Sequence, residues 1–215
     1  MKRRITRSGF QSAVAVALIA YTFHARAEAP GPVDVSVATG YVRGLGSPGG
    51  DMPGLQHLAG DGGALRVDAG WRIGPHVSAG AYCESAWFAG GHEGTDGMTG
   101  AAAGLQGRLH ARPLSKVDPW VGLGFGWRGL WLDHGVGTHA MQGLDLARLD
   151  VGVDFQVSRG FRLAPTVGVT VTEVLSEKRP GAGGYVDVEE RKVSTFVFAG
   201  VTGRIDVLGG GSGAR

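Results

Sequence analysis

Three residues near position 80 have the side-chain types that a hydrolytic triad needs. His76 and Ser78 are two positions apart, and Glu84 follows six positions after Ser78. In such a trio the imidazole takes the proton of a hydroxyl nucleophile while the carboxylate orients the imidazole. On an extended strand six residues span roughly 20 Å, which is too far for direct contact. The spacing leaves an enzyme as a distant alternative, so we predict no catalytic residue and no cofactor.

A second group of titratable residues falls in polar, glycine-rich segments that are predicted to be loops at one end of the protein. Its members are His57, His92, Glu93, Asp96, Asp133, His134 and His139. Imidazoles and carboxylates that converge can bind Zn²⁺ or titrate near neutral pH. No two of these residues have the spacing of a strong metal motif. We interpret them as solvated loop residues, with a metal-binding or proton-sensing rim as the alternative.

A third and larger group recurs at alternate positions of the predicted strands and combines arginine with aspartate or glutamate. Its members are Arg66, Asp68, Arg72, Glu84, Arg108, His110, Arg128, Arg148, Asp150, Asp154, Arg204 and Asp206. The planar guanidinium group donates to a carboxylate through parallel N–H groups, which suits a confined space where charges must satisfy one another. We therefore predict an ion-pair network in the interior of the protein.

The elements that must position these residues are β-strands. From Pro119 to Trp131 large apolar residues alternate with glycine and polar residues, and a period of two is typical of a strand whose faces meet different surroundings. This alternation predicts eight strands, over residues 33–43, 64–73, 77–88, 101–112, 119–131, 146–157, 162–172 and 192–207. Short turns at 74–76, 113–118 and 158–160 alternate with long loops at 45–63, 89–100, 132–145 and 173–191. An even number of strands joined in this way is typical of outer-membrane barrels.

The choice of charged residues indicates which face of the strands points inward. A soluble barrel of the lipocalin kind would place the polar face in water, where Lys and Glu are common. After residue 27, however, the lysines are Lys116, Lys178 and Lys192, in a predicted turn, a loop and a strand end. Aromatic residues gather toward strand ends, as they do at membrane interfaces, at Tyr41, Trp71, Trp87, Trp127, Trp131 and Phe155. We predict an all-β fold, an eight-stranded antiparallel up-and-down transmembrane β-barrel with its polar face inward.

The first 27 residues have the pattern of a secretory signal peptide. A basic start precedes an apolar run at 13–23 and the small-x-small sequence Ala25-Arg26-Ala27. We expect residues 1–27 to be a cleaved signal peptide, residues 28–208 the barrel and residues 209–215 a glycine-rich tail. The rest of the chain has 16 basic and 19 acidic residues, so nothing favours nucleic acid as a partner. A single cysteine, Cys83, excludes an internal disulfide.

Three segments resemble a known family: PWVGLGFGW at 119–127, LDVGVDFQVSRGFRLAPTVGV at 149–169 and FAGVTGRIDVL at 198–208. They are similar to the small outer-membrane β-barrels of Gram-negative bacteria, which include the OmpA, OmpX and OmpW types. The resemblance covers about residues 28–208 and implies the fold without a specific activity. Such barrels usually end in an aromatic residue, whereas this chain continues as Leu208-GGGSGAR. The trio at positions 76, 78 and 84 is similar to that of outer-membrane lipid A deacylases, which implies the enzymatic alternative.

The turns predict which inward residues face each other. A tight turn near Pro75 places Arg66 opposite Glu84. The turn at 113–118 predicts three pairs in which a long polar side chain meets a glycine, namely Gln106 with Gly126, Arg108 with Gly124 and His110 with Gly122. Such side chains can lie across the lumen toward Asp150 or Asp154 on the far wall. Because eight strands enclose a space that side chains fill, we predict a filled lumen without steady ion conductance.

These observations lead to a functional hypothesis. We expect a monomeric outer-membrane protein that is surrounded by outer-membrane lipid and contacts an extracellular ligand or surface partner through its long loops. Its role would be structural or adhesive. The alternative from a different class is a narrow channel for small, hydrophobic solutes. A lipid-modifying enzyme is the third and most distant hypothesis.

Overall fold

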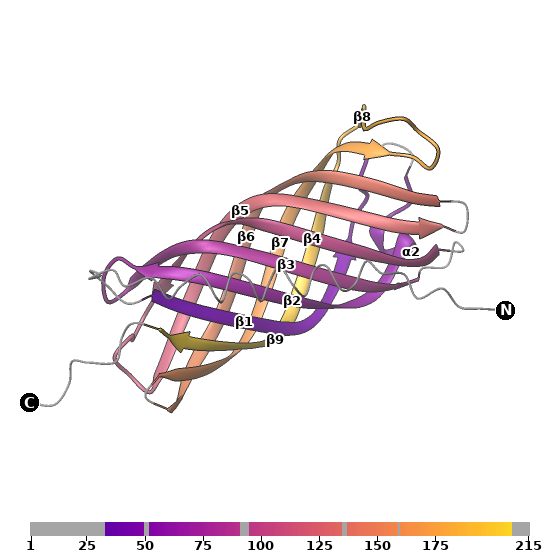
Figure 1. Cartoon of the computed structure of the whole chain (residues 1–215). Coiled ribbons are helices and arrows are strands. Elements are labelled where there is room, and N and C mark those ends of the chain that lie inside the picture. The colour runs from indigo at the N-terminus through magenta and orange to yellow at the C-terminus, as the bar shows by residue number, and fades with distance from the viewer. Residues whose placement is uncertain (1–32, 50–51, 91–94, 135–136, 159, 208–215) are drawn as a thin grey trace, which may run out of the picture. The chain divides into compact units, whose positions relative to one another are not determined.

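The computed structural model of the chain describes residues 33–49, 52–90, 95–134, 137–158 and 160–207. Eight of its strands form a barrel: β1 (Val33–Leu45), β2 (Ala59–Arg72), β3 (Val77–Gly90), β4 (Thr95–His110), β5 (Val117–His134), β6 (Gly137–Ser158), β7 (Phe161–Lys178) and β9 (Val193–Asp206). Each strand pairs antiparallel with the next one in this order, and β9 also pairs with β1, so the sheet closes on itself (Figure 1). The predicted eight-stranded antiparallel up-and-down barrel is confirmed.

The two ends of the barrel differ in how the strands are joined. At one end, here called the turn end, a hydrogen bond of 2.9 Å from Ile73 N to Val77 O closes the tight turn between β2 and β3. The barrel sequence also starts and finishes at the turn end, where Asp34 faces Asp206. We call the opposite end the loop end.

At the loop end the strands continue further than the side-chain alternation predicts. β5 runs to His134 and β6 starts at Gly137, so the loop predicted over residues 132–145 is mostly a paired hairpin. That prediction was wrong because it depended on an alternation of apolar and polar side chains. The backbone hydrogen bonds of a hairpin do not need that alternation once the strands leave an apolar environment.

Two short elements cover the loop end, and neither was predicted. The helical turn α2 (Leu55–Leu58) precedes β2, and the two-residue strand β8 (Val186–Asp187) pairs with the end of β7 (Figure 1). Leu55 and Leu58 are buried and join an apolar cluster with residues of six strands and the segment after β8: Val42, Phe88, Met98, Leu130, Leu132, Met141, Val174 and Val188. An apolar core therefore fills the loop end of the barrel.

The outer surface of the barrel is apolar on all eight strands. Exposed residues on successive strands include Val37, Trp71, Trp87, Leu105, Leu123, Leu149, Val167 and Val201. In water such a belt would be strongly unfavourable, whereas it matches the lipid-facing band of a membrane barrel. Among the described residues, no helix has the length and apolar character needed to cross a bilayer.

One predicted register is confirmed and the other is wrong by two positions. Arg66 faces Glu84, as the turn near Pro75 predicts. Across β4 and β5 the observed pairs are instead Gln106 with Gly124, Arg108 with Gly122 and His110 with Trp120. The turn is tightened by a hydrogen bond of 2.9 Å from Ser115 N to Arg112 O, and Asp118 accepts a further one of 2.8 Å from Arg112 N. These contacts centre the turn closer to β4 than its sequence suggests.

Two β-bulges change which residues of β6 and β7 point inward. On β6, Leu146 has no single partner across from β7, and the inward positions change from Asp145 to Arg148 around it. On β7, Leu175 has the same effect, so that Val174 and then Glu177 point inward. An extra residue shifts the strand alternation by one, and this shift brings Asp145 and Glu177 into the barrel.

Candidate functional site in the barrel lumen

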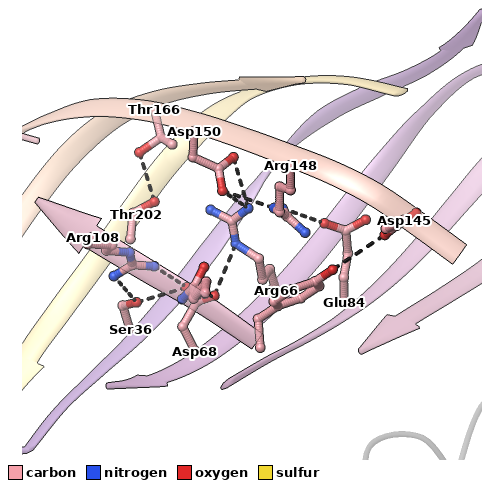
Figure 2. A network of polar contacts seen from close by, with 12 residues as sticks. Ser36, Arg66, Asp68, Glu84, Arg108, Asp145, Arg148, Asp150, Thr166 and Thr202 are labelled. Atoms are coloured by element: carbon pink, nitrogen blue, oxygen red, sulfur yellow. Dashed lines mark hydrogen bonds and ion pairs between the residues drawn. The ribbon is translucent and has the colours of Figure 1, made fainter. Parts of the chain in front are cut away.

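The middle of the lumen holds four arginines and four acids in one connected network, part of which is shown in Figure 2. We call this set the central cluster, which consists of Arg66, Asp68, Glu84, Arg108, Arg128, Asp145, Arg148 and Asp150. Charges balance within it, as burial in a confined interior requires. Its members are less than 10% exposed.

Asp68 organises one side of the central cluster. Its carboxylate accepts hydrogen bonds of 2.8 Å from Arg108, 2.9 Å from Ser36 and 3.0 Å from Gln106. Arg66 Nε lies 3.4 Å from the same carboxylate. These donors come from β1, β2 and β4, so a single buried acid ties three strands together.

The network then crosses the lumen through shared acids. Asp150 accepts from Arg66 at 3.1 Å and from Arg148 at 2.9 Å. Glu84 accepts from Arg148 at 2.9 Å and from Arg128 at 3.3 Å. Figure 2 shows Asp150 between Arg66 and Arg148, and Glu84 next to Arg148. The chain of contacts joins β2, β3, β5 and β6.

Asp145 ends this chain near the loop end. It accepts hydrogen bonds of 2.8 Å from Arg128 Nε and 2.6 Å from Thr172. On β7 the inward residues from 164 to 172 are small and mostly carry hydroxyl groups, and Thr166 is hydrogen-bonded at 2.8 Å to Thr202 of β9 (Figure 2). Large side chains from one wall thus pack against small ones on the other, which is how a narrow barrel is filled.

Aromatic rings complete the filling. The guanidinium carbon of Arg128 lies 4.4 Å from the Phe196 ring centre, and that of Arg148 lies 4.6 Å from the Tyr82 ring. Such contacts stabilise a desolvated guanidinium group. Tyr82 in turn fits over Gly126, where a Cβ would approach its hydroxyl to 2.8 Å.

A second group lies on the turn-end side of the central cluster. We call it the turn-end cluster, and it consists of Asp34, Arg72, His110, Asp118, Asp154, Arg162, Arg204 and Asp206. His110 Nδ1 lies 2.8 Å from Asp118, and Arg204 Nη1 lies 2.5 Å from Asp154. The Trp120 indole N–H donates to Asp154 at 2.9 Å. The cluster therefore closes the turn end with charged and hydrogen-bonded side chains.

The structure places all twelve residues of the predicted ion-pair network in the lumen. Ten are buried, whereas the side chains of Arg72 and Asp206 at the turn end are 13% and 22% exposed. Their partners differ from the predicted ones in places. Arg108 binds Asp68 on β2 instead of an acid on β6, because the β2–β3 and β3–β4 registers place these two residues within reach of each other. Arg66 and Glu84 face each other, yet each forms its closest ion pairs with other residues.

Sequence reasoning missed three inward acids, Asp145, Asp118 and Glu177, and Glu177 falls in the loop predicted at 173–191. Asp145 falls in a predicted loop and has the parity of the outward face of β6, so only the bulge at Leu146 turns it inward. Asp118 was assigned to a turn. It shares the even numbering of the inward residues Trp120 and Arg128 on β5, and extending that alternation by one step would have found it.

The residues of the predicted loop rim do not form one cluster in the described part of the chain. His57 is exposed on α2, and Asp133 accepts a hydrogen bond of 2.9 Å from Thr138. His139 Nε2 lies 3.0 Å from Glu177. His92 and Glu93 fall outside the described residues, as do the side chains of Asp96 and His134.

The three residues of the possible hydrolytic triad are also separate. His76 Nδ1 lies 2.8 Å from the carbonyl oxygen of His110, so its ring is oriented by the backbone. Ser78 is buried near the turn end, whereas Glu84 lies in the central cluster and is held by two arginines. This arrangement does not provide a base that is oriented by the Glu84 carboxylate.

A closed eight-stranded barrel with an apolar exterior and a buried charged lumen is a transmembrane β-barrel. No protein-family model and no curated protein matches the chain. It is similar to the crystal structure of Neisserial surface protein A, with 14% identity and a TM-score of 0.57 over 81% of this chain and 96% of that one. The fold is therefore that of the small eight-stranded outer-membrane barrels, and the resemblance seen in the sequence is confirmed at the level of fold.

Two further solved structures are similar over most of the chain. OprG, an outer-membrane protein from Pseudomonas aeruginosa, has 13% identity and a TM-score of 0.48 over 82% of this chain and 98% of that one. The outer-membrane protein AlkL has 13% identity and a TM-score of 0.48 over 89% of this chain and 99% of that one.

Proposed function

We propose that the chain is a monomeric outer-membrane barrel with a closed lumen, which is surrounded by outer-membrane lipid and presents its loop end as an interaction surface at the cell exterior. The observation that carries this proposal is the filling of the barrel. Charged side chains occupy its middle and turn end, and an apolar cluster under α2 occupies its loop end. The barrel then acts as a rigid support for surface contacts, and not as a passage.

The loop end has the features of a contact surface. The segment between β7 and β9 exposes Tyr185 and Val186 and also the charged side chain of Arg179. Its base is fixed by a bridge between Gly49 and Arg191 and by the pairing of β8 with β7. Exposed aromatic and charged side chains on an anchored loop are typical of binding surfaces.

The arrangement also argues against catalysis by the residues considered above. Glu84 is fixed by Arg128 and Arg148 in the middle of the lumen, away from His76 at the turn end. A carboxylate that is held by two guanidinium groups is a poor partner for an imidazole base. We therefore propose an interaction protein and not a lipid-modifying enzyme.

Conductance measurements test whether the lumen is closed. Refolded wild-type protein in planar bilayers should show no steady ion conductance, because eight strands leave room only for the side chains that occupy the lumen. Stable openings that Gly124→Leu abolishes would contradict the proposal and favour the channel hypothesis. Gly124 suits this comparison because it faces Gln106 in the lumen.

Accessibility on intact cells tests the orientation and the contact surface. An epitope inserted between Gly183 and Gly184, where an added side chain would meet nothing within 4 Å, should be stained on unpermeabilised cells. The same epitope after Gly74 should be stained only after permeabilisation. Deletion of residues 181–185 should reduce adhesion of the expressing cells to a host-cell layer while the barrel still folds. The opposite staining pattern, or unchanged adhesion, would refute the proposed surface role.

A further inference from the structure

The ring of His110 is oriented as it is in metal-binding histidines. Its Nδ1 lies 2.8 Å from Asp118 Oδ2, and its Nε2 lies 3.4 Å from Arg204 Nη1. A guanidinium group can only donate, so Nε2 accepts and Nδ1 carries the proton that is donated to Asp118. A histidine that donates one ring N–H to a carboxylate, and so presents the other nitrogen to a cation, has the arrangement found around bound metals.

Asp154 presents its carboxylate to the same point. Oδ2 lies 2.5 Å from Arg204 Nη1, while Oδ1 accepts the hydrogen bond of 2.9 Å from the Trp120 indole. Potential ligand atoms of His110, Asp118 and Asp154 all lie within 4.8 Å of one another, and all three residues are buried. In the described part of the chain this is the one group of three histidines or acids with such spacing. Nη1 of Arg204 thus occupies the place where a cation would bind both His110 and Asp154.

Arg204 is incompletely satisfied in that position. Its Nε and Nη2 atoms are buried, and no acceptor of the described residues forms a hydrogen bond with either. Buried N–H donors without an acceptor are unfavourable. The Arg204 side chain could therefore leave its present position for one in which other acceptors bind these N–H groups.

Such acceptors lie on the neighbouring strand β1, at Asp34, and two positions further along β9, at Asp206. Within the described residues no donor forms a hydrogen bond with Asp34 Oδ2 or Asp206 Oδ1, and Arg72 approaches them only to 4.0 and 3.6 Å. On the β1–β9 pair Arg204 faces Ser36, so Asp34 is its diagonal neighbour. Long side chains reach diagonal neighbours across antiparallel strands.

We propose that the turn end of the lumen is a site for a divalent transition-metal ion, in which His110 Nε2 and Asp154 are the protein ligands and Arg204 is the internal cation that the metal displaces toward Asp34. Asp118 and Trp120 orient the two ligands. A mixed nitrogen and oxygen set suits Zn²⁺, Co²⁺, Ni²⁺ or Cu²⁺ better than Ca²⁺ or Mg²⁺. The cluster has four acids and three arginines, a net charge of −1, so a divalent ion would change its net charge only to +1.

The proposal implies that Arg204 competes with the metal. Refolded wild-type barrel should bind one Zn²⁺ in isothermal titration calorimetry with ZnCl₂ alone as the probe, and Co²⁺ should give a visible absorption band. Arg204→Gln removes the competing charge and should tighten Zn²⁺ binding by about tenfold or more. His110→Gln removes a ligand and should weaken binding by about tenfold or more. The heat-dependent gel mobility of each variant shows whether its barrel is folded.

His139→Gln is the matched control, because His139 also lies beside a carboxylate but at the loop end. It should leave the Zn²⁺ affinity unchanged. Absence of saturable binding to the wild type up to about 1 mM Zn²⁺ would overturn the proposal. It would also fail if Arg204→Gln did not tighten binding, or if His139→Gln weakened binding while His110→Gln did not. A gain of affinity in Arg204→Gln counts only when the variant keeps the gel mobility of the folded barrel, because an unfolded chain can also bind metal, and this variant remains informative even if His110→Gln does not fold.

Discussion

Glu84 is the acid whose removal should most clearly test the central cluster. It accepts hydrogen bonds of 2.9 Å from Arg148 and 3.3 Å from Arg128, and its side chain is 5% exposed. Glu84→Ala leaves two buried guanidinium groups with less compensation. Breaking a buried ion pair in this way typically costs about 3–5 kcal/mol. Because Arg148 keeps Asp150 and Arg128 keeps Asp145, we expect the lower end of that range, about 3 kcal/mol.

Urea unfolding of the refolded barrel in lipid vesicles, followed by tryptophan emission, measures this change by linear extrapolation. Glu84→Gln keeps neutral acceptor capacity and should cost less, about 1–2 kcal/mol. The matched control is Glu173→Ala at the loop end, where Glu173 and Arg191 are 4.0 Å apart and 28% and 47% exposed. A pair with this exposure contributes about 0–1 kcal/mol.

A double variant separates the charge effect from the loss of packing. Glu84→Ala combined with Arg148→Ala removes one charge of each sign, so the central cluster stays balanced. The double variant should be more stable than the sum of the two single losses implies, by about 1–3 kcal/mol. Equal urea midpoints for wild type and Glu84→Ala, or strict additivity in the double variant, would refute the assignment of Glu84 as a shared buried acid.

Two further pairs of substitutions, each a test with its control, probe the inward and outward faces. Gly168→Ala should destabilise the barrel by about 1–3 kcal/mol, because a Cβ at this position would overlap the carboxylate of Asp150, which its ion pairs hold in place. Gly74→Ala is the control and should be neutral in the same urea assay, because a Cβ there would meet nothing within 4 Å. Leu123→Arg should cost about 2–4 kcal/mol by placing a charge on the lipid face, and Leu114→Arg in the exposed turn should cost nothing measurable. If both arginine variants unfold at the wild-type urea concentration, the exterior is not lipid-facing.

The sequence alone determined the number of strands, their order and the direction of their faces. A period of two in side-chain character is a local property, and the preference of apolar residues for lipid and of paired charges for a confined interior follows from residue type. The tight turn at Pro75 also set the facing of Arg66 and Glu84, since a short turn leaves little freedom in register. The sequence could not show α2 or the strand extensions at the loop end, where the alternation is lost.

Only the tertiary structure decided which charges meet. Arg66 reaches Asp150, 84 positions away, because barrel closure brings β6 across the lumen from β2. The bulge at Leu146 turned Asp145 inward against the parity of its strand, and the registers of β2, β3 and β4 brought Arg108 within reach of Asp68. A shift of one or two residues changes the partner of every side chain beyond it. The alternation of side chains within each segment therefore determines where the strands are. The ion pairs and the arrangement around His110 depend instead on strand register and barrel closure, which no single segment of the chain determines.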